Sequence, residues 1–251
     1  MPYVKMDQKQ IYYDDFGEGN AILFIHPPGL GRKTFLKQLP LQLQYRLLIP
    51  DLSGHGDSFS PTSNMSVACY VEEVEAIRAD AKVNELFLFG YSSGGMIAQE
   101  YAILYPEKVK GIILSGGFPK VVSDLFKAEH QIGIFMARRY PRFLGKVLSI
   151  SHFKEKALQD ALYHHVQKSN NSVWAQFYKL SMEYDCLHKL SQLHTPLLLL
   201  YGKKADVVNQ HVRLYEPVKN KKVHFINKAG HQLPTRHADE VNRIIHQFVG
   251  R

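Results

Sequence analysis

The chain is poor in cysteine and has no long apolar stretch. Cys69 and Cys186 are its two cysteines among 251 residues, and neither belongs to a C-x-x-C pair. Two isolated thiols cannot build a disulfide framework or a structural zinc site, so we expect a reduced, cytoplasmic setting. The longest apolar run, residues 196–201, is far shorter than the ~20 residues that span a bilayer. The first residues also lack the apolar core of a signal peptide. We therefore expect no membrane span and no export.

Positive charge is in excess, but it is scattered along the chain. There are 31 Lys and Arg against 23 Asp and Glu, which gives a net charge of +8. The densest basic runs, at residues 219–222, 203–204 and 138–139, are too short for a nucleic-acid binding stripe. We therefore expect no nucleic-acid partner. The sequence leaves the oligomeric state open.

Motifs for nucleotides and metals are missing as well. Neither G-x-G-x-x-G nor G-x-x-x-x-G-K-[ST] occurs, so no nucleotide cofactor is expected. The histidines at 164, 165, 188 and 194 lack the ligand spacing with cysteine or carboxylate clusters that metal sites show. The sequence therefore predicts neither a cofactor nor a metal site.

What the chain does have is a regular alternation of strand and helix patterns. Short apolar runs are typical of strands buried on both faces, and they occur at 21–25, 47–49, 86–89, 109–115 and 196–201. Two further strand patterns lie at 10–15 and 223–226. Helical patterns separate the strands, at 33–39, 66–81, 96–104, 209–217 and 238–249. Sequential βα units predict an α/β fold with a doubly wound, mostly parallel sheet.

One block breaks this alternation. Residues 118–190 show helix after helix, at 121–139, 154–167 and 172–185, with no convincing strand. We interpret the block as a helical cap inserted into a core formed by residues 1–117 and 191–251, and we expect a mobile cap over the strand ends. Within it, Trp174, Phe177, Tyr178 and Met182 share a helical stripe that fits either the core of the cap or an acyl pocket.

The strongest local signal is the G-x-S-x-G motif of Gly90, Tyr91, Ser92, Ser93 and Gly94. It directly follows the apolar run 86–89 and directly precedes a helical pattern. A turn this tight strains the backbone of the serine, so its neighbours must lack side chains that would clash. The same turn lifts the serine hydroxyl clear of the carboxyl edge of the sheet. Ser92 is therefore the candidate nucleophile.

A serine hydroxyl needs a base, and the base needs a third group that orients it. Asp206 follows the strand pattern 196–201, and His231 follows the pattern 223–226, so both are expected on the same rim as Ser92. Of 13 histidines, only His231 combines a preceding glycine, a loop after a strand and a position after the candidate acid. Asp185 remains an alternative acid.

These motifs resemble the α/β-hydrolase fold family over nearly the whole chain. Beyond the serine motif, the resemblance is carried by YYDDFGEG at 12–19, HPPG at 26–29, PDLSGHGDS at 50–58 and AGH at 229–231. It implies that Ser92 is the nucleophile, His231 the base and Asp206 the residue that orients His231. It also places the cap of that family where the helical block lies. His55 is expected to support its loop by hydrogen bonding.

The resemblance further implies an oxyanion hole with two main-chain donors. One is the N–H of Ser93, directly after the nucleophile. The family usually has histidine-glycine where this chain has His26 and Pro27, and neither Pro27 nor Pro28 has an N–H to offer. Gly29 is therefore the expected second donor. A second departure is that Asp206 lies four residues after Gly202, where three are more common.

The function expected from these residues is a cofactor-independent serine hydrolase that cleaves a small or medium carboxylic ester through an acyl-enzyme. Its partner would be a small acyl substrate. A thioester, a lactone, an amide or a carbon–carbon bond would use the same residues, so these substrates stay open. So does a ligand-binding signalling protein that keeps the triad but turns over slowly. Reactions that need an aspartate nucleophile are disfavoured because Ser92 stands at that position.

Overall fold

The computed structural model of the protein describes residues 3–6, 8–60 and 64–250, and for Asp206 it describes the main chain alone. Its central element is an eight-stranded sheet with the order β1-β2-β4-β3-β5-β6-β7-β8. The strands are β1 (Tyr3–Met6), β2 (Lys9–Phe16), β3 (Ala21–Ile25), β4 (Arg46–Pro50), β5 (Leu86–Tyr91), β6 (Val109–Ser115), β7 (Leu197–Gly202) and β8 (Lys221–Ile226).

The sheet is mostly parallel, as the sequence predicts. From β4 to β8 all neighbouring strands pair in parallel, whereas β2 pairs antiparallel with β4 and β1 antiparallel with β2. Every residue of β3, β5 and β7 is buried, which explains why these strands are continuous apolar runs. The register pairs Ile25 with Gly90 and Tyr91 with Ser115, so the carboxyl ends of these strands meet at one edge.

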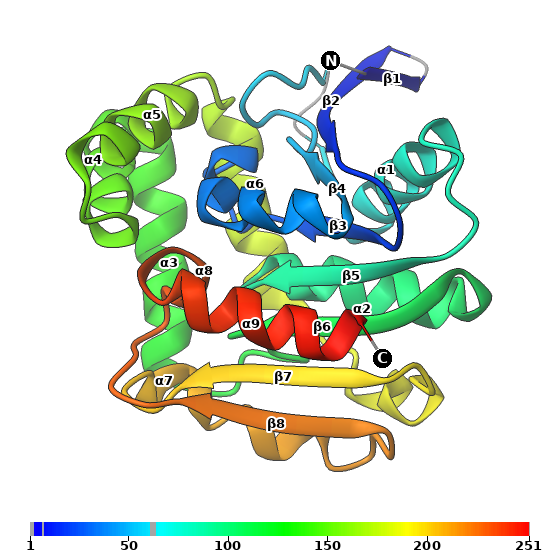
Figure 1. Ribbon diagram of the computed structural model, residues 1–251. Helices are drawn as coiled ribbons and strands as arrows, with labels where there is room; N and C mark the ends of the chain where they lie inside the picture. The colour runs from blue at the N-terminus through cyan, green and yellow to red at the C-terminus, as the bar shows by residue number, and fades with distance from the viewer. Residues whose placement is uncertain (1–2, 7, 61–63, 251) are drawn as a thin grey trace.

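Helices cover both faces of the sheet (Figure 1). Neighbouring residues of β5 point to opposite faces, as the pleat requires. Leu88 belongs to a core cluster with Ile77 and Met96, on the side of α1 (Val67–Asp80) and α2 (Gly94–Leu104). Phe89 belongs to the other cluster with Phe35 and Ile245, on the side of η1 (Arg32–Leu43) and α9 (Ala238–Val249). The sheet is thus doubly wound.

The remaining helices of the core are short. They are η2 (Pro106–Lys108), η3 (Leu187–Gln192), α7 (Asp206–Asn209), η4 (Val212–Tyr215) and α8 (Leu233–Arg236). Two expected helices differ from the sequence prediction. The pattern at 33–39 forms a 3-10 helix with Pro40 inside it, and the pattern at 209–217 is divided between α7 and η4. A proline inside a helix removes a donor, which favours the tighter and irregular form.

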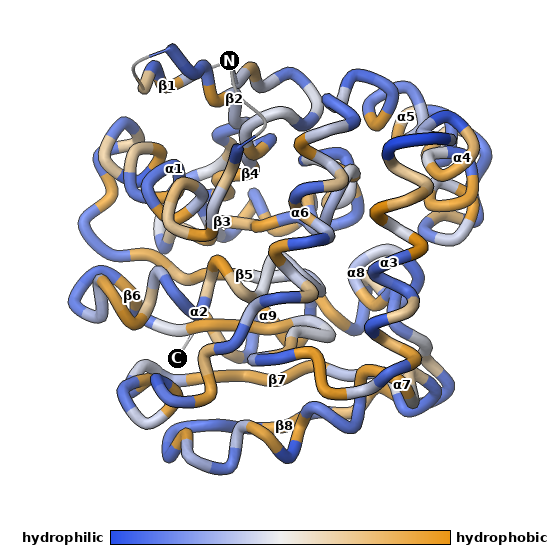
Figure 2. Tube along the Cα trace, turned by 180° about the vertical axis from the view of Figure 1, so that it is seen from behind, coloured by the Kyte–Doolittle hydropathy of each residue, from blue (hydrophilic) through white to orange (hydrophobic). Residues whose placement is uncertain are grey.

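Four α-helices lie between β6 and β7 in the chain: α3 (Asp124–Arg139), α4 (Pro141–His152), α5 (Lys156–Val166) and α6 (Asn171–Glu183). Figure 1 shows α3, α4 and α5 beside the carboxyl edge, toward which the arrowheads of β5, β7 and β8 point. The sequence patterns miss α4. Tyr140 is non-helical and Pro141 opens a separate helix, which lies in the gap between the helical patterns at 121–139 and 154–167. Along α3 and α4, hydrophilic and hydrophobic segments alternate (Figure 2).

The segment before and within α6 is tied to the loops of the core. Ser169 Oγ donates to the carbonyl of Gly29 at 3.2 Å, and the N–H of Asn170 donates to the carbonyl of Gly54 at 2.8 Å. A Cβ atom on Gly29 would lie 2.1 Å from the indole of Trp174, and one on Gly54 would lie 2.7 Å from Val173. Both glycines also have positive φ. Glycine is therefore required at these positions both by the backbone conformation and by the close contact with α6.

Within the described residues, no helix combines the length and the apolar character needed to cross a membrane.

Candidate active site

Ser92 sits on a tight turn between β5 and α2. Its φ is +52°, a left-handed conformation that is strained for a residue with a side chain. A Cβ atom on Gly90 would lie 2.7 Å from the Cα of Gly95, and one on Gly94 would lie 2.3 Å from the carbonyl of Ile25. These contacts explain why the motif needs glycine at both positions. The N–H of Ser92 is held by the carbonyl of Ser115 at 2.8 Å.

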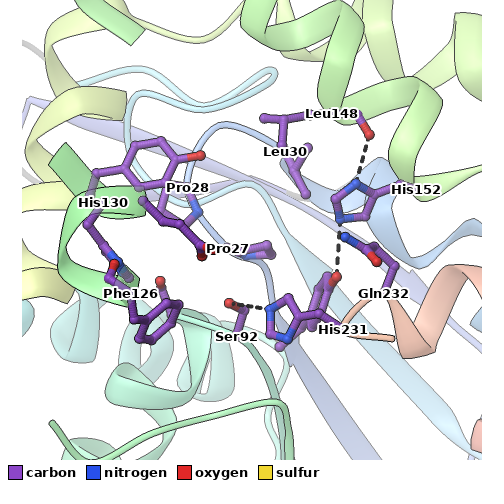
Figure 3. Close-up of a pocket in the computed structure, with 14 residues that line it drawn as sticks. Pro27, Pro28, Leu30, Ser92, Phe126, His130, Leu148, His152, His231 and Gln232 are labelled. Atoms are coloured by element: carbon purple, nitrogen blue, oxygen red, sulfur yellow. Dashed lines mark hydrogen bonds between the residues drawn. The ribbon is translucent and has the colours of Figure 1, made fainter. Parts of the chain in front are cut away.

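His231 reaches Ser92 from the loop after β8. Its Nε2 lies 2.9 Å from Ser92 Oγ, within hydrogen-bond distance (Figure 3). The ring is held between Tyr91, with a centroid distance of 5.6 Å, and Gly116, where a Cβ atom would lie 2.5 Å from the imidazole. Burial lowers the pKa of His231 to about 4, with smaller contributions from His152 and His130. The imidazole is therefore neutral at pH 7, as a base must be.

The other nitrogen of His231, Nδ1, is buried and has no hydrogen-bond partner within the described part of the chain. Asp206 begins α7, and the N–H of Lys204 in the same loop donates to the carbonyl of Ala229 at 2.8 Å. The loops of the predicted acid and base are therefore adjacent, while the Asp206 side chain lies outside the described residues. Asp185 is placed elsewhere: its carboxylate binds Lys120 at 2.7 Å and accepts from the N–H of Leu187.

Of the two predicted oxyanion donors, Ser93 is among the residues that line the cavity and Gly29 is not. Ser93 lines the cavity beside Ser92 and is the N-cap of α2, whose first amides point outward. Pro27 and Pro28 also line it, whereas Gly29 does not. The N–H of Leu30 donates back to the carbonyl of Pro27 at 3.4 Å. The second donor therefore stays a prediction.

A cavity of about 210 Å³ opens above Ser92 and His231. Four helical residues of the block 118–190 that the sequence analysis did not identify contribute walls: Phe126, Glu129, His130 and Leu148. His152 is a fifth, and its Nε2 accepts from the hydroxyl of Tyr91 at 3.2 Å, while its Nδ1 donates to the carbonyl of Leu148 at 2.8 Å (Figure 3). Local sequence carries no signal for these residues, because only the packing of α3 and α4 brings them to Ser92.

The aromatic stripe on α6 serves mainly as core. Trp174 and Phe177 are buried, and of the four stripe residues only Tyr178 lines the cavity. His55 supports its loop, as the sequence predicts, because its Nδ1 lies 3.0 Å from the carbonyl of Ser53. His26 does the same for the neighbouring loop, since its Nε2 accepts from the N–H of Leu52 at 3.0 Å.

A buried ionic cluster joins the core loops to α5. Arg32 contacts Asp51, and it donates to Asp14 at 3.1 Å and to Asp57 at 2.7 Å. His165 Nε2 lies 2.8 Å from Asp51. Burial alone would raise the pKa of Asp51, but His165 and Arg32 hold it well below its usual value.

The cluster corrects the sequence analysis, which left His165 without carboxylate neighbours. Ligand atoms of Asp51, Asp57 and His165 lie within 4.8 Å of one another, which is a spacing that a metal ion could accept. Sequence spacing missed the group because the contact joins α5 to loops more than a hundred residues earlier. The guanidinium of Arg32 already supplies the positive charge that these carboxylates need, so the cluster fits an ion-pair network.

We expect Arg32→Met to lower the free energy of unfolding by about 3–5 kcal/mol, because it leaves Asp51 and Asp14 buried without the guanidinium that balances their charge. Arg46→Met is the matched control. Arg46 pairs with Asp15 at 2.7 Å on a partly exposed surface, so its loss should cost no more than about 1 kcal/mol. Urea unfolding of both variants measures the two values. Equal losses of unfolding free energy in the two variants would show that the Arg32 cluster stabilises the protein no more than the partly exposed Arg46 pair does.

A comparison with known protein families shows to which family the chain belongs. Residues 36–236 match the family model described as Serine aminopeptidase, S33. The chain belongs to this α/β-hydrolase family. The match covers the serine turn, the block 118–190 and the loop of His231, so the resemblance inferred from the motifs is confirmed.

Relatives of this α/β-hydrolase are named for several reactions. It is 25% identical to a 2-hydroxy-6-oxononadienedioate/2-hydroxy-6-oxononatrienedioate hydrolase of Pseudomonas putida, over 95% of this chain and 91% of the relative. It is also 25% identical to a pimeloyl-[acyl-carrier protein] methyl ester esterase of Shewanella woodyi, over 92% and 94%. Among solved structures, an esterase from Exiguobacterium antarcticum superimposes with a TM-score of 0.90 at 19% identity, covering 99% of both chains. The last likeness shows the fold.

Proposed function

We propose that this α/β-hydrolase cleaves a small or medium carboxylic ester through an acyl-enzyme on Ser92. The observation that supports this most directly is the 2.9 Å contact between His231 Nε2 and the hydroxyl of Ser92, made at the base of a cavity. A serine with a neutral, partly buried imidazole at this distance has the base that a hydroxyl nucleophile requires. The Ser92 turn, with its φ of +52°, presents the oxygen to the cavity.

In the proposed reaction, Ser92 Oγ attacks the ester carbonyl while its proton passes to His231 Nε2. The N–H of Ser93, with Gly29 as the second proposed donor, holds the tetrahedral oxyanion. Collapse breaks the carbon–oxygen bond, and His231 returns the proton to the leaving alcohol. Water then attacks the acyl-enzyme and gives its proton to His231, and the carboxylic acid leaves with Ser92 restored. Asp206 would hold the imidazole through its buried Nδ1.

The walls of the cavity support an apolar acyl group of modest size. About 210 Å³ is below the ~300–1,000 Å³ of sites for drug-sized ligands. Phe126, Leu148, Tyr178 and Pro28 give the walls apolar surface. Because most of these side chains come from α3, α4 and α6, we propose that residues 118–190 act as the cap that selects the acyl chain.

A carbon–carbon bond hydrolase is the second candidate, because the Pseudomonas putida relative is named as the hydrolase of a 2-hydroxy-6-oxo-dienedioate and covers 95% of this chain. A panel of activated esters with increasing acyl length, run beside a vinylogous 1,5-diketone, separates the two candidates. Ester turnover that peaks at short acyl chains supports the proposal. Turnover of the diketone alone would replace it, and stoichiometric ligand retention without turnover would contradict both.

We expect Asp206→Asn to lower kcat by up to about 10⁴-fold, as loss of the orienting carboxylate does in serine proteases. An ionised partner on Nδ1 also raises the pKa of the imidazole, so the acid limb of the kcat/KM profile should move to lower pH in this variant. Asp185→Asn is the control, because Asp185 pairs with Lys120 away from His231. If Asp185→Asn lowers kcat strongly while Asp206→Asn leaves it nearly normal, Asp185 and not Asp206 is the acid of the triad.

A further inference from the structure

The outer face of α3 and α4 exposes an unusual amount of apolar surface. Fourteen large hydrophobic residues are exposed in the described part of the chain, and eight of them lie within residues 122–150. We call these eight the cap face: Val122, Leu125, Ile132, Phe135, Tyr140, Phe143, Val147 and Ile150. Single exposed apolar residues are ordinary, but a group of this size on two adjacent helices marks an interaction surface.

The cap face is a second apolar stripe, separate from the one that packs inward. On α4 the inward stripe contains Gly145, Ser149 and His152, whereas Phe143 and Val147 lie one turn apart on the opposite side. Phe143 is 63% exposed and Ile132 on α3 is 62% exposed. The rings of Phe135 and Tyr140, with centroids 5.9 Å apart, connect the two helices into one surface.

This surface borders the mouth of the Ser92 cavity. Glu129 lines the cavity and is itself exposed, so it marks the opening. Leu125 lies four residues before Glu129 and Ile132 three residues after it, which places all three on one side of α3. Any flat partner that covers the cap face would therefore lie against the entrance of the site.

The charges around the cap face are mainly positive. Residues 122–150 contain five Lys and Arg against two acidic residues, Asp124 and Glu129. Arg138, Arg139 and Arg142 are exposed, and no ion pair within the described ranges includes them. Apolar and aromatic side chains surrounded by Arg and Lys are the pattern of a helix that lies in the headgroup region of an anionic bilayer.

We propose that the cap face docks on the surface of an anionic lipid bilayer. A second copy of the chain fits this charge pattern less well, because a two-fold contact through the cap face would bring two copies of the same basic surface together. On the bilayer the cationic rim meets phospholipid headgroups, and the apolar side chains enter the interface. The opening beside Glu129 then faces the region where apolar esters concentrate, a consequence that rests on the proposed function.

Flotation of the full chain with phosphatidylcholine vesicles, with and without phosphatidylserine, tests the docking. We expect binding to vesicles that contain phosphatidylserine, weakened by added salt. Phe135→Ser combined with Phe143→Ser should weaken binding by at least about tenfold, because both rings lose interfacial burial. Arg139→Glu combined with Arg142→Glu should weaken it to a similar extent. Ser92→Ala should bind vesicles as well as the unaltered protein does. The docking can therefore be tested independently of the proposed reaction.

The matched control is Leu43→Ser combined with Leu104→Ser, which removes two exposed leucines, 86% and 57% accessible, outside the cap face. This control should bind vesicles normally. Hydrogen exchange tests the docking on the unaltered chain. The main-chain amides of residues 122–150 should exchange more slowly when anionic vesicles are added. The proposal is overturned if the control and the cap-face variant bind equally well, if anionic vesicles capture no protein, or if light scattering shows a dimer that the cap-face variant dissociates.

Discussion

Ser92→Ala is expected to lower kcat for an activated ester by about 10⁶-fold, the loss found when the nucleophile of a serine protease is removed. The same variant should no longer react with a fluorophosphonate probe. The physical reason is that Ser92 Oγ lies 2.9 Å from Nε2 of the partly buried His231 imidazole. Ser92 therefore has the base that a serine hydroxyl needs to become a strong nucleophile at neutral pH.

Ser93→Ala is the sharpest comparison for this experiment. Ser93 is the adjacent residue, it is buried, and its expected contribution is a main-chain N–H that alanine keeps. The Ser93→Ala variant should therefore still react with the probe. Mass spectrometry of the labelled peptide separates the two serines. A Ser92→Ala variant that is labelled, or labelling that follows Ser93, would remove Ser92 from the role of nucleophile.

A steep loss of stability between pH 6.5 and about pH 4 is the second large effect. Burial lowers the pKa values of His26, His152 and His231 to about 4 and that of His55 to about 3. An unfolded histidine binds its proton near pH 6.5. Between these values the unfolded chain holds protons that the folded chain does not, so the free energy of unfolding falls as the pH falls.

The expected size is comparable with the whole stability of a domain. Each of these buried histidines contributes up to about 3 kcal/mol over this interval, and a native domain holds only about 5–15 kcal/mol. Urea unfolding at a series of pH values measures the change. Fluorescence of Trp174, the single tryptophan, follows it at the contact with Gly29.

A pair of histidine variants tests the assignment. His55→Phe removes one buried titrating group and should reduce the slope of stability against pH by about one proton between pH 6.5 and 4.5. His188→Gln removes an exposed histidine and should leave the slope unchanged. If stability stays constant down to pH 4.5, the buried histidines do not control the acid response.

The sheet could be predicted from the sequence because its strands are buried on both faces. The apolar runs that became β3, β5 and β7 reflect that burial directly, and β3 and β6 have the predicted bounds. The serine turn was predictable for a similar reason, since the contact that requires glycine at position 90 is made with Gly95, within one βα unit. Local geometry leaves a local pattern in the sequence.

Contacts between distant segments leave no such pattern. Gly116 gives His231 its space, yet it looks like any glycine at the end of a strand. His130 and His152 face the cavity only because α3 and α4 fold back over the carboxyl edge. The pairing of His165 with Asp51 joins residues 114 positions apart in the chain. Spacing rules compare neighbours along the chain, so they could not find these partners.

The close packing of Gly29 and Gly54 against Trp174 and Val173 also constrains when the active site forms during synthesis. The loop that begins at Pro27 leaves the ribosome early, but the side chains that complete its surroundings follow more than a hundred residues later. His231 follows later still. A nascent chain that ends before α6 therefore carries the serine turn without these packing partners and without His231, so we expect partly made chains to have no hydrolase activity.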